Sequence, residues 1–522
     1  MKLKSTFLAV AFLAVAHQIT FAQEVEWSEL VKSNGRGTVI YPEQGKNFYT
    51  TVWSGGMLAG SYQLKRYEDF MPIAQEKIVL KTESGMGSLN DMIIVKGKMV
   101  VFLSDKADKQ NKLYYQRYTE SCTPEGVPIL LAEYDMPKGW NKSGYFNVIQ
   151  SKNKGFFCVE YSVPSTKTES ERFGYKVYDE EFNVISEGEY ESPYDPREAD
   201  ITNHYLSNTG DLFLGLKVYN TNDRGKVRDY TSLKKYLIFL IKDGDLTEMN
   251  LDLGDKHITD MTFSSDERRI LTCTGLYGEG AYRTKGAFYF QVDFANQEIV
   301  NEGFSEFTKD FITQDWSEKQ KTKANKREEK GKGSPQLYSY DFREVHTTAD
   351  GGVVVVMEQY YVVVHTTRDP KTGATTTTYT YYYNDIITYR VQEDGQFEWI
   401  QKMNKRQVST NDGGYLSSIG GYFTDDKFIM FFNDNNKNYT ETGDFSIEEK
   451  GLYTASFRKK TNCVAKVEID LTNGEYSRNR YTSREETAAY AVPKKFTADY
   501  INSEMFMYFQ YGKKEKFGLL KF

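Results

Sequence analysis

The hydrophobic positions of this chain fall into many short runs, separated by residues that favour turns. NFYTTVW, MIIVKGKMVVFL, KYLIFLI and KFIMFF are examples of the runs, and KDGD, EDGQ and LTNGE lie between such runs. Runs of four to eight residues that are rich in aromatic and β-branched side chains, bounded by Gly, Asp and Asn, are typical of antiparallel strands. Convincing amphipathic helices are almost absent. The pattern predicts an all-β protein.

The strand-like segments recur as a unit with a short first strand, an apolar strand, a Tyr-rich strand and a last strand. We place the unit starts near Gly37, Ser88, Gly144, Asp200, His257, Tyr340, Gly414 and Lys494. A four-stranded unit that repeats about every 40 to 50 residues is the pattern of a β-propeller blade. We therefore predict a single propeller domain over residues 23–522, with eight blades favoured and seven as the alternative.

The last unit supplies only three strands before Phe522. The segment Val25–Lys32 would supply the fourth, so that the two ends of the chain close the ring. Closure of this kind removes the exposed strand edges that otherwise pair with other chains.

Two segments interrupt the repeat. The first, 309–335, is densely charged and permissive for a short helix, and its eight basic and five acidic residues give it a net charge of +3. The second, 357–390, predicts an extended β-hairpin, in which two long arms flank the turn Asp369–Gly373. Thr and Tyr fill this hairpin, which we call the ribbon, and both have high strand propensity even in solvent.

Residues 1–22 match a secretory signal peptide. Lys2 and Lys4 precede ten apolar residues, and small residues lie before the predicted cleavage site after Ala22. The apolar run is too short to span a membrane. We expect an exported, soluble protein in the periplasm or outside the cell.

Charge and cysteine content narrow the partners. The whole chain carries a net charge of −7, and loss of residues 1–22 would make it −9. Nucleic acid is therefore not expected as a partner, because phosphate binding requires clustered Lys and Arg. Cys158 and Cys273 lie in apolar strand-like runs and are expected to be buried thiols.

Catalytic and metal motifs are mostly missing. The chain has no H-E-x-x-H pair and no G-x-S-x-G elbow, so no catalytic residue is proposed and a non-enzymatic role is favoured. Asp434, Asn436 and Asn438 have the spacing of calcium ligands, but Tyr439 and Phe445 stand where an EF-hand needs Gly and Glu. No cofactor is expected, with a looser calcium loop at these residues as the alternative.

Candidate binding residues come from the ribbon and from the polar loop 405–415, which connects two predicted blades. Exposed Tyr side chains supply large contact area at low entropic cost, and inter-blade loops line one face of a propeller. The candidates are Tyr379, Tyr381, Tyr383, Asn384, Asp385, Arg406, Gln407, Asn411, Asp412 and Tyr415.

The stretch 311–438 resembles a group of uncharacterised secreted propeller proteins of Bacteroidota. The matching elements include FITQDWSEKQKTKANKREEKGKGSPQLYSYDFRE, DGGVVVVMEQYY and FNDNNKN. The turn MTFSSDERRIL at Met261 resembles, more loosely, that of Tol-type periplasmic propellers. The first resemblance implies architecture and compartment, and the second implies protein binding more than catalysis.

Together these features predict a secreted or periplasmic propeller that binds another envelope or secreted protein as a scaffold module. The alternative is a propeller that binds or cleaves carbohydrate, since Tyr rings stack on sugars and paired carboxylates from different blades cannot be found from spacing. A sugar enzyme should show two converging carboxylates with raised pKa values.

Overall fold

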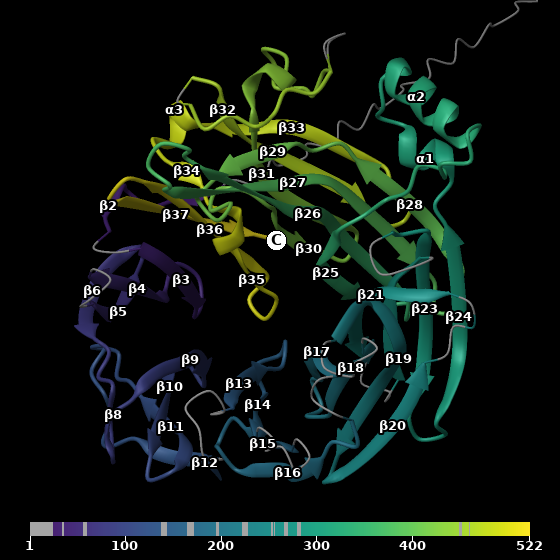
Figure 1. Cartoon of the computed structure of the whole chain (residues 1–522). Helices are drawn as coiled ribbons and strands as arrows, with labels where there is room; N and C mark the ends of the chain where they lie inside the picture. Colours follow the sequence, from purple (N-terminus) through teal and green to yellow (C-terminus); the bar gives the residue numbers. More distant parts are fainter. Residues whose placement is uncertain are drawn as a thin grey trace, which may run out of the picture.

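A computed structural model gives the fold of the chain (Figure 1). It describes residues 25–33, 36–55, 60–136, 144–163, 172–194, 198–221, 228–251, 254, 256–265, 270–278, 283–447, 451–458 and 460–522. The predicted signal peptide and the turn that follows Ser265 lie outside the described residues.

Eight antiparallel sheets of at least four strands form the described part of the chain, and they are arranged in a ring (Figure 1). The first two blades consist of β3 (Arg36–Pro42), β4 (Phe48–Gly55), β5 (Gly60–Glu68), β6 (Met71–Lys77), then β9 (Ser88–Val95), β10 (Lys98–Ala107), β11 (Gln110–Arg117) and β12 (Ile129–Asp135). The short strands β7 (Lys81–Thr82) and β8 (Gly85–Met86) connect them.

Blades three to five repeat the same order. Blade three consists of β13 (Tyr145–Gln150), β14 (Phe156–Val163), β15 (Arg172–Asp179) and β16 (Val184–Glu191). Blade four consists of β17 (Ala199–Leu206), β18 (Leu212–Thr221), β19 (Arg228–Lys242) and β20 (Asp245–Leu251). Blade five consists of β21 (His257–Ser265), β22 (Ile270–Gly278), β23 (Gly286–Asp293) and β24 (Glu298–Glu306).

Blade six carries both interruptions. It follows α1 (Lys309–Thr313) and α2 (Glu318–Glu328), and it consists of β25 (Tyr340–Thr347), β26 (Val353–Arg368), β27 (Thr375–Val391) and β28 (Phe397–Met403), with β29 (Gln407–Thr410) added on β27. Blade seven consists of β30 (Gly420–Phe423), β31 (Lys427–Asn435), β32 (Asn462–Asp470) and β33 (Tyr476–Ser483), with the turn η1 (Asn436–Asn438) after β31.

Blade eight combines both ends of the described chain. It contains β34 (Tyr490–Ala491), β35 (Thr497–Asp499), β36 (Glu504–Tyr511) and β37 (Lys514–Lys521), and α3 (Arg484–Thr487) and η2 (Pro493–Lys495) lie in the connection from blade seven. On its outer side, β1 (Glu26–Trp27) and β2 (Val31–Lys32) pair with β37. The prediction that Val25–Lys32 completes the last blade is therefore confirmed, as are the eight blades, the ribbon and the short helical insertion.

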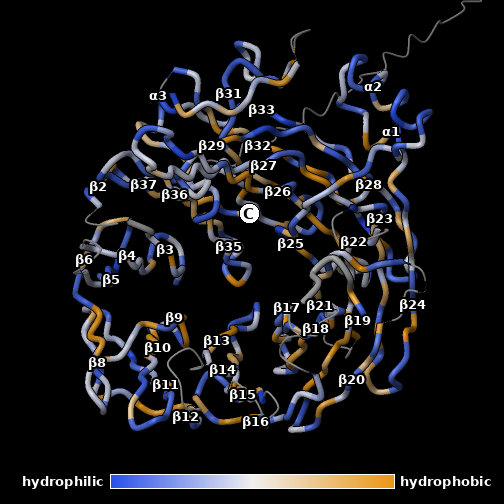
Figure 2. The backbone as a smooth tube through the Cα atoms, in the orientation of Figure 1, coloured by the Kyte–Doolittle hydropathy of each residue, from blue (hydrophilic) through white to orange (hydrophobic). Residues whose placement is uncertain are grey.

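Among the described residues, the core consists of eight hydrophobic clusters, each of which lies between two neighbouring blades. The cluster around Phe102 and Phe157 joins blades two and three, for example, and the cluster around Phe48 and Phe517 joins blades one and eight. Figure 2 shows the corresponding hydrophobic stretches along the strands, whereas α2 is mostly hydrophilic. A blade therefore buries its faces only against its neighbours, as in other repeat architectures.

All four cysteines, Cys122, Cys158, Cys273 and Cys463, are buried and unpaired. This confirms the prediction for Cys158 and Cys273. No helix within the described ranges has the length and apolar character that a membrane crossing requires.

One turn of blade three reaches across the ring. Lys152 Nζ donates to Val345 O of blade six at 3.0 Å, and Lys154 Nζ lies 3.2 Å from Asp499 Oδ2 of blade eight. The β13–β14 turn and the β35–β36 turn point toward each other in Figure 1. This contact narrows the central opening at the end where the first and second strands of each blade connect.

Closure between blades eight and one also depends on a buried carboxylate. Glu515 on β37 is 1% exposed and accepts hydrogen bonds from Thr38, Tyr67 and Tyr508. Lys65 Nζ, which is also buried, lies 3.6 Å from Glu515 Oε1. The network joins the inner and third strands of blade one to the sheet that contains both chain ends.

Replacement of Glu515 by Ala should destabilise the propeller, because Lys65 would be left buried without its counter-charge. A loss of about 3–5 kcal/mol is typical when one partner of a buried ion pair is removed. Urea unfolding measures the loss, and Glu29→Ala on the exposed part of the same junction is the control, expected within about 0.5 kcal/mol of the parent. Equal stability of both variants would contradict a role of Glu515 in closure.

Candidate functional site

The three surfaces predicted from the sequence lie on one face of the propeller. The ribbon joins the second and third strands of blade six, whereas 309–335 and 405–415 connect the fourth strand of one blade to the first strand of the next. In an antiparallel blade these two kinds of connection emerge at the same end. Figure 1 shows α1, α2, β27 and β29 grouped on the same part of the ring.

The ribbon is a continuous two-stranded extension of β26 and β27. Its pairs run without a break from Tyr360↔Tyr383 to Arg368↔Thr375. At the tip, Asp369 Oδ1 accepts from the backbone N–H groups of Lys371 and Thr372, and Gly373 adopts φ 70° to close the turn. From Val363 to the tip, every β26 residue is exposed.

Tyrosines cover both sides of the ribbon base. On one side the rings of Tyr360 and Tyr383 lie 4.6 Å apart, and on the other Tyr361 and Tyr382 stack at 4.6 Å. Cross-strand aromatic pairs stabilise an isolated ribbon without a core. Farther out, the exposed side chains of Val364 and its partner Tyr379 form an apolar strip on the side of Tyr360 and Tyr383, and Val363 is exposed on the opposite side.

The loop 405–415 is a third strand at the ribbon base. Its strand β29 pairs with Thr380–Tyr383 of β27. Just beyond β29, Asn411 accepts from Tyr379 N at 2.8 Å and donates its own N–H to Tyr379 O at 2.9 Å. Asp412 accepts from Ser409 Oγ and Gly414 N, so its carboxylate holds the turn that ends the strand.

A buried ion cluster fixes this base to the propeller. Glu358 is fully buried, with Lys405 Nζ 2.6 Å from Oε1, Arg343 Nε 2.7 Å from Oε2, and Ser418 Oγ 2.6 Å from Oε2. Lys405 Nζ also donates to Tyr383 O and Gln407 Oε1. Burial alone would raise the pKa of Glu358, but the charges of Lys405 and Arg343 outweigh it and hold the pKa below its usual value.

Lys494 of η2 connects the ribbon base to blade eight. Its Nζ lies 2.6 Å from Tyr383 Oη and 4.2 Å from the centre of that ring. Burial lowers the pKa of Lys494 to about 8; the nearby Glu358 carboxylate opposes this shift. Tyr415 Oη donates to Gln510 of β36 at 2.7 Å, so the base contacts blade eight in two places.

The structure thus brings most candidate residues together but gives them different environments. Tyr379 and Arg406 are exposed, and Tyr381 is half-buried. Gln407 is buried, and Asn384 and Asp385 are half-buried beside Gln359 and Lys402 respectively. The surface that a ligand reaches is therefore the outer ribbon together with Arg406, Asn411 and Asp412, which are all exposed, while the buried and half-buried polar candidates hold the base in place.

Several residues that define the site were missed in the sequence, above all Glu358, Arg343, Lys405 and Lys494. A signal for Glu358 did exist, because it interrupts the apolar run VVVVMEQYYVVV. A charge within a buried strand requires a counter-charge. Its partners could not be identified, since Lys405 and Arg343 come from other segments.

Among the described residues, no group of three His, Cys, Asp or Glu side chains is placed to hold a metal ion. Asp434 instead accepts from Arg478, Asn438 and Tyr439. Asn436 Oδ1 accepts from Arg480, and Asn438 Oδ1 from Tyr453 N. The oxygens of the loop considered for calcium are thus engaged within the protein.

Comparison with known proteins adds no family. No protein-family model matches the chain, and no curated protein matches it. The WD40 domain of SCAP from fission yeast aligns over 96% of this chain and 94% of its own, at 9% identity and a TM-score of 0.37. Prolyl oligopeptidase B from Galerina marginata aligns over 95% of this chain and 54% of its own, at 10% identity and a TM-score of 0.36.

A protein of unknown function from Bacteroides caccae aligns over 70% of this chain and 93% of its own, at 10% identity and a TM-score of 0.27. The chain spans about half the length of the oligopeptidase that it matches. Similarities of this size carry no argument about function. The assignment as an eight-bladed β-propeller rests on the sheet order itself.

Replacement of Glu358 by Gln should loosen the ribbon base, because Lys405 and Arg343 lose their common counter-charge. We expect a stability loss of about 3–5 kcal/mol and faster hydrogen exchange at the amides of Tyr381–Tyr383. Asp341→Asn is the matched control, since Asp341 also lies near Arg343, at 3.7 Å, but its side chain is 45% exposed. The expected stability loss of Asp341→Asn is below about 1 kcal/mol. Similar hydrogen-exchange rates at Tyr381–Tyr383 in both variants would contradict the anchoring role of Glu358.

Lys494 should lose its proton near pH 8. Acetylation of Lys494 by a water-soluble ester, followed by peptide mass spectrometry, should therefore show a rate that rises with a midpoint of about 8. Because the folded pKa lies below the unfolded value, Lys494 also adds stability as pH rises through this range toward 10.5. A midpoint near 10 would contradict the packing of Lys494 against Tyr383.

Proposed function

We propose that this β-propeller is an exported protein-binding module of the cell envelope and that the ribbon is its docking arm. The observation that carries the proposal is an exposed apolar strip on a rigid support. Val364 and Tyr379 are 55% and 44% exposed on one side of the ribbon, and Val363 is 47% exposed on the other, although Thr at these positions would maintain the strand in solvent. Exposed apolar side chains grouped in this way mark interaction surfaces.

Anchoring of the ribbon supports the same conclusion. The Glu358 cluster, β29 and Lys494 fix the base in one position, so docking would require little ordering of the protein. Preorganisation of this kind lowers the entropic cost of association. Tyr adds large contact area for the loss of only two side-chain torsions.

The ribbon also offers a free strand edge. β25 pairs with β26 as far as Gln359, and Ser339 accepts from Tyr360 N. Beyond Tyr360, no further strand of the described chain pairs with this edge of β26. An extended segment of a partner can add to such an edge through main-chain hydrogen bonds, with side-chain contacts to the apolar strip supplying specificity.

An enzymatic role receives less support. Glu344 on the inner strand β25 has its pKa raised to about 7 by burial, partly offset by the charge of Lys152. No second carboxylate contributes to the shift of Glu344. A pair of converging acids of the kind expected for a glycosidase is thus not found around Glu344.

The proposal is tested with two variants and one control. The first variant lacks residues 367–376 and closes the ribbon with Asn-Gly, and the second carries Val364→Thr and Tyr379→Thr at full length. Tyr476→Thr, at 41% exposure on β33, is the matched control for removal of an exposed tyrosine. Cross-linking on intact cells with mass spectrometry identifies the partner, whose affinity for each purified variant is then measured.

We expect both ribbon variants to lose one partner that the parent and the Tyr476→Thr control retain. The purified partner should bind the double variant at least about tenfold more weakly, or about 1.4 kcal/mol. Unchanged melting temperatures show that the propeller itself is intact. Capture of the same proteins by all forms, or of none by any form, would refute the docking arm.

A further inference from the structure

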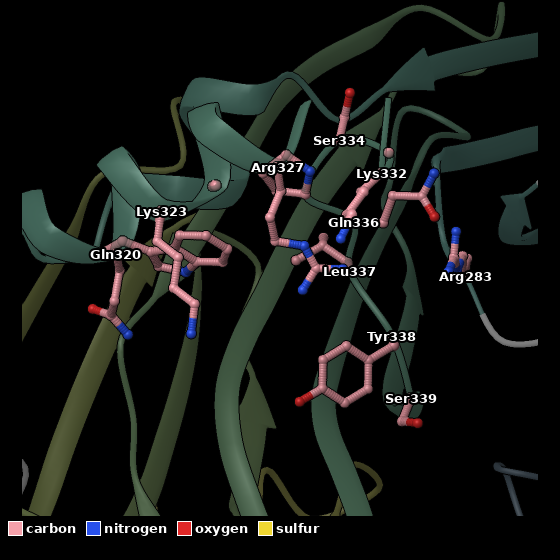
Figure 3. Close-up of a pocket in the computed structure, with 14 residues that line it drawn as sticks. Arg283, Gln320, Lys323, Arg327, Lys332, Ser334, Gln336, Leu337, Tyr338 and Ser339 are labelled. Atoms are coloured by element: carbon pink, nitrogen blue, oxygen red, sulfur yellow. The ribbon is translucent and has the colours of Figure 1, made fainter. Parts of the chain in front are cut away.

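A second surface feature lies on the insertion and is separate from the apolar strip. An open cavity of about 660 Å³ lies between α2 and the segment 332–339, and Arg283 also lines it (Figure 3). Figure 3 shows Lys323 and Arg327 extending from α2 on one side and Tyr338 facing them from the other. Trp316, just before α2, also lines the cavity.

The cations of this cavity have no acidic partners. Arg283, Lys323, Arg327 and Lys332 line it, and none of the four forms an ion pair within the part of the chain that the structure describes. These four cations are exposed and repel one another, so an anion bound among them is favoured.

Three of the five acidic residues of the insertion pair with lysines that do not line the cavity. Glu328 pairs with Lys309 and also accepts from Ser334 Oγ. Asp315 lies 3.0 Å from Lys402 Nζ, and Glu318 lies 3.5 Å from Lys321. The fold therefore neutralises lysines outside the cavity and leaves those inside it free.

The rest of the lining suits a ligand rich in hydroxyl groups. Trp316 and Tyr338 offer aromatic surfaces, and Gln320 and Gln336 offer amides that both donate and accept. Gln336 Oε1 is buried without a hydrogen-bond partner. An unsatisfied buried acceptor is costly, and a ligand donor would satisfy it.

We propose that this cavity binds an acidic oligosaccharide, with sugar carboxylates on Arg327 and Lys323 and a hydroxyl group donated to Gln336. The planar guanidinium of Arg327 matches a carboxylate in a bidentate geometry. An acidic peptide fits less well, because Lys is depleted at protein interfaces and this lining holds two lysines and no exposed aliphatic anchor. The site is independent of the docking arm, and either one can fail without the other.

Isothermal titration calorimetry of the full chain with trigalacturonate tests the proposal by measuring the binding affinity. The cavity variant is Lys323→Gln with Arg327→Gln, and the control is Lys319→Gln with Lys326→Gln. The control residues belong to the same helix but line only the cavity on its other side. Both double variants remove the same charge from exposed positions, so similar melting temperatures are expected.

We expect the parent and the control to bind trigalacturonate with similar affinity and the cavity variant to bind at least tenfold more weakly. Neutral maltotriose should not bind, and the change in tryptophan fluorescence during the titration should follow the same curve as the heat. Absence of binding to the parent, or equal weakening in both double variants, would overturn the proposal. Tighter binding of triglutamate or of a single-stranded oligonucleotide than of trigalacturonate would also overturn it, in favour of a peptide or a general polyanion.

Discussion

Each blade of this protein is a four-stranded sheet with two faces to bury, and only the neighbouring blades can bury them. The eight hydrophobic clusters therefore lie between blades, and the ring is stable only when the last blade meets the first. That closure depends on β1 and β2 adding to β37 and on Glu515 connecting β37 to Thr38 and Tyr67 of blade one. An open ring would expose two hydrophobic faces and a strand edge.

A closed ring also explains why one blade can carry two large additions. The core of blade six lies at its contacts with blades five and seven, so the extension of β26 and β27 into the ribbon leaves that core unchanged. The cost is that the ribbon needs an anchor of its own. The buried Glu358 with Lys405 and Arg343 supplies it, and Lys402 does the same for the insertion through Asp315 and Ile312 O.

The two proposed surfaces differ in their chemistry although they lie on the same face. The outer ribbon presents Val363, Val364 and Tyr379 without a strong charge, which suits another protein. The cavity beside α2 presents unpaired cations and aromatic rings, which suits an acidic sugar. Tyr338 lies 5.6 Å from Tyr361, so a row of rings connects the cavity to the ribbon base.

Much of the architecture was determined by the sequence itself, because the alternation of strand and turn residues is a local property. The repeat predicted eight blades, and most inner strands begin within a few residues of the predicted unit starts, as at Ser88, His257 and Tyr340. The predicted start near Gly414 is six residues before Gly420, where β30 begins, because the polar loop before β30 resembles a turn. The turn Asp369–Gly373 predicted the ribbon because Asp and Gly fix its geometry.

Only the tertiary structure decided which charged groups meet. Glu358, Arg343, Lys405 and Lys494 are far apart along the chain, and burial in a common base makes them one cluster. The same is true of the cavity, which Arg283 of blade five lines together with residues of α2. It is also true of Gln407 and Asn411, whose side chains form hydrogen bonds with Asn433 and Tyr379. Periodicity along a chain reports which side of a strand is buried, but pairing between distant segments depends on the complete ring.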